Sequence, residues 1–204
     1  MTNRGGRIIW ALEELEQSYE LVDLQLFKGE QRQPQFLNLN PHGKVPTLVI
    51  RNSTEDEPEV ISESLAILYT LADRHQSLLP KEAQARAQCH QWLAYVATEM
   101  EPPLWTQAKH SFVYPEKRRI PEIFPSCLFE FQRVLKHIEQ TMSDDRLYIL
   151  GDEFTLADIY VGQTLMWSKS RSFGDMGEIT KSYINRLKAR PAWQRAIGTL
   201  KSNN

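Results

Sequence analysis

Hydrophobic residues in the first 75 positions follow two patterns, one with helical spacing and one of short apolar runs. Ile8, Leu12 and Leu15 fall on one stripe of a helix, so the first pattern predicts a helix over residues 7–17. A similar stripe predicts a second helix over residues 64–74. The short apolar runs, bounded by turn-like segments, predict strands at residues 19–24, 47–50 and 59–61.

After Pro80 the apolar residues recur every three or four positions, which is the spacing of helices that pack on a core. Pro102 and Pro103 are expected to end the first of these helices. The helices are predicted at residues 83–101, 121–142, 155–169 and 183–200, the last with a restart at Pro191. The change of pattern predicts an α/β domain over residues 1–75, a linker over 76–82 and an all-helical domain over 83–204.

The first domain is expected to lack one strand in the sequence as given. A helix that crosses between two parallel strands needs a strand before it, and only six residues precede Arg7, none of them strand-like. Because such a strand belongs inside the sheet, its loss would leave neighbouring strand edges unpaired. We therefore expect the missing strand to lie upstream of Met1, and a sheet that naturally lacks this strand is the alternative.

The chain has 204 residues, of which 41% are hydrophobic and 25% charged, as in an ordinary folded protein. Its 24 basic and 26 acidic residues nearly balance, so charge gives no argument for a nucleic acid or a membrane surface as a partner. No apolar run approaches the roughly 20 residues that span a bilayer, and no signal peptide is recognisable, so a cytoplasmic location is expected. The two cysteines, Cys89 and Cys127, favour inert thiols over a disulfide, and no metal site is expected.

Residues 40–48, with the sequence NPHGKVPTL, place a proline directly ahead of an apolar strand. Pro46 cannot donate a hydrogen bond to a neighbouring strand, which makes this position unusual. A cis Val45–Pro46 bond would explain it, because the backbone N–H and C=O of Val45 would be free to pair with a peptide ligand as an added strand. An ordinary trans proline at the start of a strand is the alternative.

Residues 61–65, with the sequence ISESL, place an acidic residue and a hydroxyl at a strand-to-helix corner. The N-terminus of a helix presents unpaired N–H groups and a partial positive charge, so a ligand carboxylate is favoured there. The Ser64 hydroxyl would donate to that carboxylate, and Glu63 could accept from an α-ammonium group. In the alternative interpretation, Ser62 or Ser64 only caps the helix.

Thr155 and Asp158 form a third pattern, a capping box that starts a helix in the C-terminal domain. With WALEEL at 10–15, GKVPTL at 43–48, Glu63-Ser64, and FTLADI at 154–159, in this order and spacing, the chain resembles the glutathione transferase family. The resemblance extends over nearly the whole chain. It implies a thioredoxin-like N-terminal domain followed by an all-helical C-terminal domain, usually in a homodimer.

The resemblance also implies which residues hold glutathione as a co-substrate. Val45 would pair its backbone with the cysteinyl part, next to a cis Pro46. Glu63 and Ser64 would hold the γ-glutamyl end, and Lys44 would lie near the glycine carboxylate. A plain surface lysine is the alternative for Lys44.

Catalysis in this family requires glutathione as a thiolate, because the thiol itself is a poor nucleophile. The family provides a Ser, Tyr or Cys, and sometimes a Thr or Asn, in the loop after the first strand. Here that loop would be residues 1–6, which contain no Ser, Tyr or Cys. Thr2 and Asn3 are therefore the candidates for the activating residue.

The second substrate is expected beside the aromatic-rich segment after the first long helix, where Trp105, Phe112 and Tyr114 would form apolar walls for a small hydrophobic electrophile. The alternative is that Trp105 and Phe112 belong to the core. His110, in the same segment, is expected to be a surface histidine with its hydrogen bonds satisfied rather than a base.

Two functions from different classes remain open. The first is an enzyme that conjugates glutathione to electrophiles, as in detoxification, or reduces small disulfides and peroxides. The second is a non-catalytic relative that uses the fold for binding or dimerisation. Lys44, Val45-Pro46 and Glu63-Ser64 favour ligand binding, whereas the missing Ser, Tyr or Cys favours the second.

Overall fold

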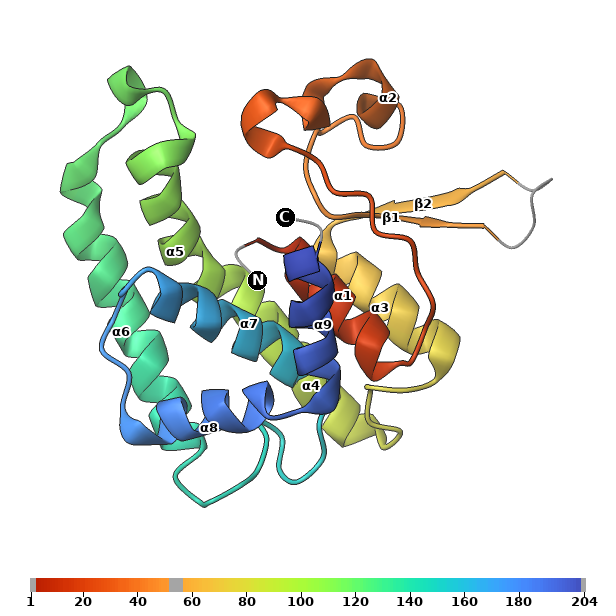
Figure 1. Ribbon diagram of the computed structural model, residues 1–204. Coiled ribbons are helices and arrows are strands. Elements are labelled where there is room, and N and C mark those ends of the chain that lie inside the picture. Colours follow the sequence, from red (N-terminus) through yellow and green to blue (C-terminus); the bar gives the residue numbers. More distant parts are fainter. Residues whose placement is uncertain (1–2, 52–56, 203–204) are drawn as a thin grey trace. The chain divides into compact units, whose positions relative to one another are not determined.

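The computed structural model describes residues 3–51 and 57–202 (Figure 1). The chain forms two compact units. The first unit comprises Met1–Ser77 together with Pro191–Asn204, and the second comprises Leu78–Arg190. The predicted second domain, 83–204, includes the last helix, whereas the two-unit division assigns this helix to the first unit. The predicted domain limits, 1–75 and 83–204, stay a prediction.

The first unit combines helices with a small antiparallel sheet. Its elements are α1 (Gly5–Glu14), short 3-10 turns at Leu26–Lys28 and Glu30–Arg32, α2 (Pro34–Leu37), β1 (Thr47–Ile50), β2 (Glu59–Ser62), α3 (Ser64–His75) and α9 (Pro191–Ser202). β1 pairs with β2 in the register Thr47↔Ser62 to Ile50↔Glu59. Two predicted strands and both predicted helices of this region are confirmed.

The predicted strand at residues 19–24 is wrong, because this segment has no regular secondary structure. In the described part of the chain the sheet has two strands, β1 and β2, and neither pairs with residues 19–24. Val22 is 71% exposed, so its apolar side chain is not packed as a core strand would pack it. Apolar composition alone cannot make a strand without a hydrogen-bonding neighbour.

The core of the first unit lies where α1 contacts α3 and α9 (Figure 1). Trp10 and Ala11 are fully buried, and so are Ile67 and Leu68 of α3. At the other end of α1, Arg195 donates from Nε to Oε2 of Glu13 and from Nη2 to the Glu13 carbonyl, each at 2.7 Å. This contact satisfies a carbonyl in the last turn of α1 and links α9 to it.

The second unit is helical. Its elements are α4 (Ala83–Tyr95), a π-helical turn at Val96–Met100, α5 (Glu101–Ala108), a second π-helical turn at Lys109–Val113, 3-10 turns at Glu116–Arg118 and Pro121–Ile123, α6 (Phe124–Thr141), α7 (Leu156–Ser170) and α8 (Glu178–Lys188). The four helical regions predicted after Pro80 are confirmed, and so is the restart at Pro191, where α9 of the first unit follows α8.

Pro102 and Pro103 do not end a helix, so that prediction is wrong. They lie in the first turn of α5, directly after the π-helical turn Val96–Met100. Prolines are tolerated in a first turn because the missing N–H groups have no partner there anyway. The wider π turn changes the hydrogen-bonding pattern just before the prolines, and the helical path continues.

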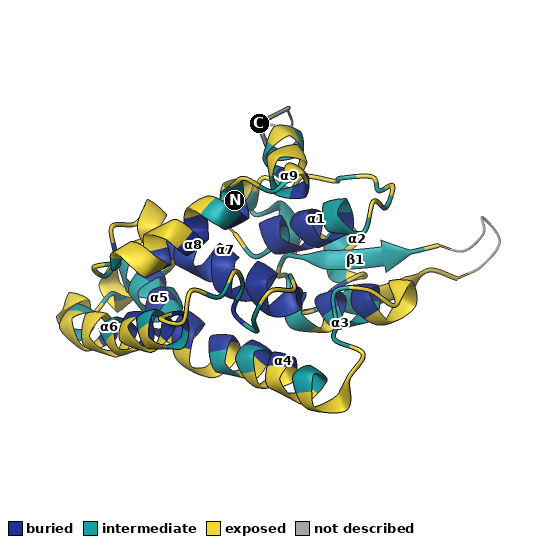
Figure 2. Cartoon of the chain, turned by 90° about the horizontal axis from the view of Figure 1, so that it is seen from below, coloured by how far each residue is buried: buried dark blue, intermediate teal, exposed yellow. Residues whose placement is uncertain are grey.

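Helix α7 is the centre of the second unit, and its residues are buried from Leu156 to Ser168 (Figure 2). The predicted capping box at its N-terminus is confirmed, since Oδ2 of Asp158 accepts from the Thr155 N–H at 2.8 Å. Oδ1 of Asp158 accepts from the Ile149 N–H at 2.8 Å and from the Tyr183 hydroxyl at 2.7 Å. One buried carboxylate thus joins the start of α7, the preceding loop and α8.

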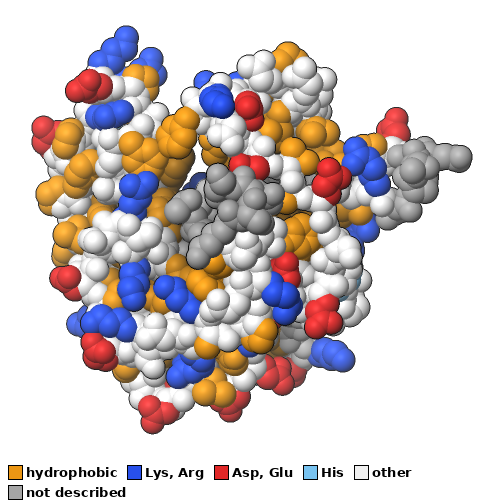
Figure 3. Space-filling view, in the orientation of Figure 1, with side chains coloured by type: hydrophobic (Ala, Val, Ile, Leu, Met, Phe, Trp, Pro, Cys, Tyr) orange, Lys and Arg blue, Asp and Glu red, His pale blue; other side chains and the backbone are white. Residues whose placement is uncertain are grey.

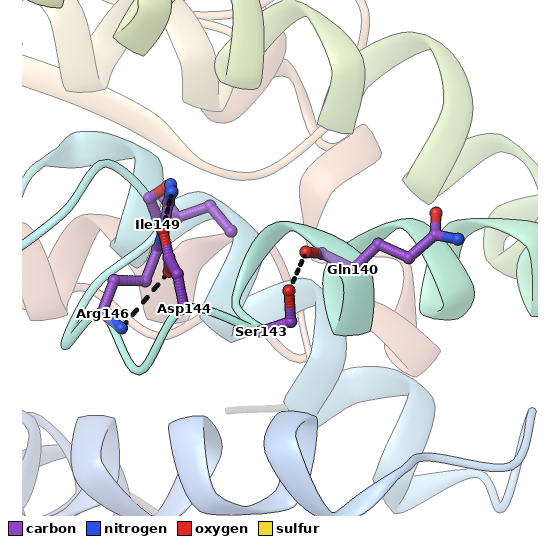
Figure 4. A network of polar contacts seen from close by, with 5 residues as sticks. All are labelled: Gln140, Ser143, Asp144, Arg146 and Ile149. Carbon is purple, nitrogen blue, oxygen red and sulfur yellow. Dashed lines mark hydrogen bonds and ion pairs between the residues drawn. The ribbon is translucent and has the colours of Figure 1, made fainter.

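The loop between α6 and α7 is held by two separate sets of polar contacts (Figure 4). Ser143 donates to the Gln140 carbonyl at 2.8 Å, in the last turn of α6. Arg146 binds both oxygens of Asp144 and also donates to the Ile149 carbonyl at 3.2 Å. The contact from Arg146 thus holds Ile149, whose N–H group donates to Asp158.

In the part of the chain that the structure describes, no helix combines the length and the apolar composition that crossing a membrane requires.

The buried carboxyl of Asp158 predicts a pH-dependent contribution to stability. Burial raises its pKa to about 6, although hydrogen bonds from Ile149, Tyr183 and Thr155 act in the opposite direction. A carboxyl with a raised pKa binds its proton more tightly in the folded state, so the free energy of unfolding falls as pH rises from about 4 to about 6. We expect a loss on the order of 3 kcal/mol, measurable by urea denaturation across this range.

Asp158→Asn is the matched control because it keeps the shape of the side chain and removes the titration. The wild-type protein should lose stability relative to this variant between about pH 4 and pH 6, and the difference should then stay constant. Equal pH dependence of the two proteins would contradict the assignment.

Candidate functional site

The register of β1 and β2 brings the two predicted ligand-binding motifs to one end of the hairpin. Thr47 pairs with Ser62, so Pro46 and Glu63 flank the same terminal pair. Lys44 and Val45 precede Pro46, and Ser64 begins α3 directly after Glu63. Residues almost twenty positions apart in sequence therefore share one corner of the first unit.

The Val45–Pro46 bond is cis, as predicted, so the trans alternative is wrong. Asn40, which is 3% exposed, holds the loop around it. Its Nδ2 donates to the Lys44 carbonyl at 2.8 Å, and its Oδ1 accepts from the His42 N–H at 3.1 Å. The side chain of Lys44 is exposed, whereas Val45 and Pro46 are half-buried.

Gly43 completes this turn with a φ of +60°, a left-handed conformation that favours glycine. A Cβ atom at this position would lie 3.0 Å from the Gln31 carbonyl oxygen, so a side chain would also press on the neighbouring segment. The turn 40–46 is therefore shaped by two residues, Asn40 and Gly43, that sit beside the ligand-binding candidates.

The corner before α3 combines an exposed acid with a buried hydroxyl. Glu63 has a φ of 67°, which is unusual for a residue with a side chain, and it is exposed. Ser64 is 4% exposed, and its Oγ accepts a hydrogen bond from Nη1 of Arg7 at 3.2 Å. Ser64 therefore does not cap α3, and the N-cap residue Glu63 makes no side-chain cap. The first N–H groups of α3 are left for another acceptor.

Arg7 joins the start of α1 to this corner. It is fully buried, and in the described part of the first unit the buried polar side chains are those of Arg7, Asn40 and Ser64. All three lie at the hairpin end where the predicted motifs meet. Buried polar groups carry a desolvation cost unless they are paired, so their concentration at one corner marks it as the candidate site.

Asn3 lies just before α1, and its side chain has a definite orientation. Its Oδ1 accepts from the Gly5 N–H at 2.9 Å. The oxygen of the amide is thereby turned towards the helix, and the –NH₂ group, the only donor of this side chain, is turned away from that N–H. Thr2, the other candidate for an activating residue, lies outside the described residues.

The second-substrate candidates Trp105, Phe112 and Tyr114 belong to the second unit. Trp105 and Tyr114 are half-buried, and Phe112 is 40% exposed with the Arg171 guanidinium 4.5 Å from its ring centre. Phe112 is therefore not a core residue. His110 packs edge-on against Tyr114, and its Nδ1 accepts from the Ile120 N–H at 3.0 Å.

The two cysteines are free and buried. Burial raises the pKa of the Cys89 thiol to about 11, and burial also raises the pKa of Cys127. Neither thiol is therefore ionised at neutral pH, and neither is suited to act as a nucleophile. On the face shown in Figure 3, basic and acidic side chains are interspersed.

Comparison with known proteins identifies the family. Residues 5–74 match the family model of the glutathione S-transferase N-terminal domain, and residues 127–197 match that of the glutathione S-transferase C-terminal domain. The chain belongs to the glutathione S-transferase family. The predicted fold, a thioredoxin-like N-terminal domain followed by an all-helical one, is thereby confirmed.

Relatives and solved structures agree with this assignment. The chain is 30% identical to the disulfide-bond oxidoreductase YfcG of Escherichia coli, covering 96% of this chain and 91% of that protein. It is 27% identical to a glutathione S-transferase of Hyoscyamus muticus, covering 94% and 91%. A glutathione transferase homologue from Lodderomyces elongisporus, solved with two glutathione molecules per subunit, is 25% identical with a TM-score of 0.83, covering 96% and 94%.

Sequence reasoning missed Arg7 and Asn40 as residues of this corner. Arg7 falls on the predicted helix, and an arginine is seldom fully buried. Asn40 begins the NPHGKVPTL segment, and a short polar residue ahead of a turn was a usable signal, since asparagine often bonds to backbone two residues on. Nothing in the local sequence around Arg7 indicates Ser64, 57 residues away, as its partner.

Asn40→Ala should lower the free energy of unfolding by about 2 kcal/mol, because it leaves the Lys44 carbonyl and the His42 N–H without their partner. Urea denaturation measures this change. Asn38→Ala is the control, since Asn38 is an exposed asparagine in the same region. Equal stability of the two variants would show that Asn40 does not hold the turn.

Proposed function

We propose that this chain binds glutathione at the corner formed by Lys44, Val45, Pro46, Glu63 and Ser64, and uses its thiol in a transfer or exchange reaction. The proposal depends on the register of β1 and β2. This register brings the backbone of Val45, which could pair with a peptide, and the N-terminus of α3 to the same end of the hairpin. Glutathione is a small peptide with carboxylates at both ends and a thiol between them, so it suits such a corner.

The γ-glutamyl end would lie at the N-terminus of α3. Its carboxylate would accept from the first N–H groups of the helix and from the Ser64 hydroxyl, where the helix dipole favours negative charge. The exposed Glu63 carboxylate would accept from the α-ammonium group. Both groups of one amino acid would then be recognised by two consecutive residues.

The cysteinyl part would pair with the backbone of Val45, which adds the ligand to the hairpin end as a short strand. Lys44 is exposed and lies one residue before Val45, within reach of the glycine carboxylate at the far end of the ligand. The thiol would then lie between the two anchored ends.

The sulfur would be activated by Asn3 or Thr2. For Asn3, the bond between its oxygen and the Gly5 N–H fits a donor role, since the amide –NH₂ is the only donor of this side chain. A hydrogen bond to sulfur stabilises the thiolate and lowers the pKa of the thiol. The chain's own cysteines have raised pKa values, so glutathione would provide the reacting sulfur.

Two reactions of the thiolate are open. It would attack an electrophilic carbon of a small hydrophobic compound, releasing a leaving group or adding across a double bond. Alternatively it would attack a disulfide, forming a mixed disulfide and releasing a thiolate, and a second glutathione would resolve the product to oxidised glutathione. The second reaction is supported by the name of the YfcG relative, and Trp105, Phe112 and Tyr114 stay the candidates for the second substrate in either reaction.

The alternative is a non-catalytic binding or dimerisation module, supported by the absence of Ser, Tyr and Cys in residues 1–6. A homodimer, a role in detoxification and a cytoplasmic location are expected from the family resemblance and stay predictions. Light scattering at micromolar concentration tests the homodimer, and a monomer would contradict it.

Ser64→Ala should weaken glutathione binding about 10- to 100-fold, because a hydrogen bond to a charged carboxylate contributes roughly 1.5–3 kcal/mol. Isothermal titration calorimetry measures the dissociation constant. Ser77→Ala is the matched control, since Ser77 is an exposed serine of the same unit. Unchanged affinity of the Ser64 variant would remove Ser64 from the site.

If the Asn3 amide donates to the sulfur, Asn3→Ala should raise the pKa of the thiol of bound glutathione by about 2, towards the ~8.5 of a free thiol. Thiolate absorbance followed against pH, with glutathione at saturation, measures this value. Asn38→Ala should leave it unchanged. A pKa near ~8.5 already in the wild-type protein would favour the non-catalytic module.

A further inference from the structure

Arg7 is a fully buried cation at the edge of the proposed glutathione site. Burying a guanidinium carries a large desolvation cost, so such a group is retained where hydrogen bonds and charge interactions hold it. Its Nη1 donates to Oγ of Ser64 at 3.2 Å, and Arg7 takes part in at least one further interaction. Arg7 is thus held by more than one contact, and one of its donors reaches Ser64.

The chemistry of the two groups fixes the direction of the hydrogen bond. A guanidinium has only donors, whereas a hydroxyl has one donor and two acceptor positions. Ser64 therefore acts as the acceptor towards Arg7, and its own proton must point elsewhere. In the described part of the chain, the Ser64 hydroxyl donates no hydrogen bond, although Ser64 is only 4% exposed.

A buried hydroxyl proton without an acceptor is costly unless a ligand supplies one. The N-terminus of α3 begins at the same residue, and its first N–H groups have no side-chain cap. The hydroxyl proton and these N–H groups together form a set of donors around one position. A carboxylate oxygen is the acceptor that suits such a set.

We propose that Arg7 is a positioning residue for the carboxylate of the γ-glutamyl group, acting through Ser64. By occupying a lone pair of the Ser64 oxygen, Arg7 turns the hydroxyl proton towards the ligand and polarises the O–H bond, which strengthens its donation to an anion. The buried positive charge adds a favourable field for the carboxylate at short range. This inference rests on the proposed function, because it assigns a specificity determinant to the same site.

The role of Arg7 can be tested with two ligands that differ only in the group it is meant to recognise. One is reduced glutathione, and the other is 4-aminobutyryl-cysteinyl-glycine, which lacks the γ-glutamyl carboxylate. Calorimetry should show that Arg7→Lys weakens glutathione binding about tenfold, as expected for the loss of one charge-assisted hydrogen bond, and changes binding of the second ligand less than about twofold. In a Ser64→Ala background, Arg7→Lys should have little further effect on glutathione.

Arg195→Lys is the matched control, because it removes another guanidinium of the same unit. That guanidinium donates two hydrogen bonds to Glu13 at the C-terminal end of α1. It should leave the preference for glutathione over the second ligand unchanged. Equal weakening of both ligands by Arg7→Lys, or an undiminished effect of Arg7→Lys in the Ser64→Ala background, would overturn the proposal and leave Arg7 a structural residue.

A measurement on the wild-type protein keeps the proposal testable if the Arg7 variant does not fold. The ¹⁵N resonances of the Arg7 guanidinium should shift when glutathione saturates the site and should not shift with the ligand that lacks the carboxylate. Equal shifts with both ligands, or none with either while glutathione binds, would overturn the role of Arg7. Absence of glutathione binding to the wild-type protein at millimolar concentration would instead overturn the proposed function itself.

Discussion

The antiparallel pairing of β1 with β2 is the constraint on which the candidate site depends. Because Thr47 is opposite Ser62, the residues that precede one strand and follow the other must emerge at the same end of the hairpin. A shift by one residue would turn every side chain to the opposite face and separate Pro46 from Glu63. The register of this short hairpin therefore sets the distance between the two groups that would hold the ends of a peptide ligand.

Buried polar groups distinguish the two units. In the second unit, the Asp158 carboxylate receives its hydrogen bonds from Thr155, Ile149 and Tyr183, so its environment is complete without a ligand and its role is to hold α7 in place. In the first unit, Ser64 receives a hydrogen bond from Arg7, and the described residues provide no acceptor for its proton. A complete network is typical of a structural role, whereas an incomplete one at a helix N-terminus makes this corner the candidate site.

Most of the fold could be predicted from the sequence, and the exceptions share a cause. Helical spacing located α1, α3 and the main helices of the second unit, because an amphipathic helix carries its signal within one segment. The strand predicted at residues 19–24 is not formed, because a strand also needs a hydrogen-bonding neighbour, which the local sequence does not show. The motifs at Pro46 and Ser64 were visible, but Arg7 was not, because its significance arises from a contact across 57 positions. Periodicity reports burial of apolar faces and cannot identify which polar residue is buried against which.

The proposed thiol chemistry uses the sulfur of the ligand, because the two cysteines of the chain are buried. Cys89 and Cys127 are held as neutral thiols by burial, so a reaction at sulfur needs an external thiol. A ligand fixed at both ends would carry that thiol into the protein without exposing a reactive cysteine in the resting state. Asn3 fits this arrangement because its oxygen accepts from the Gly5 N–H and its amide –NH₂ is a neutral donor. A neutral donor stabilises a thiolate less than a cation does, and the sulfur keeps more of its nucleophilicity as its pKa stays closer to ambient pH.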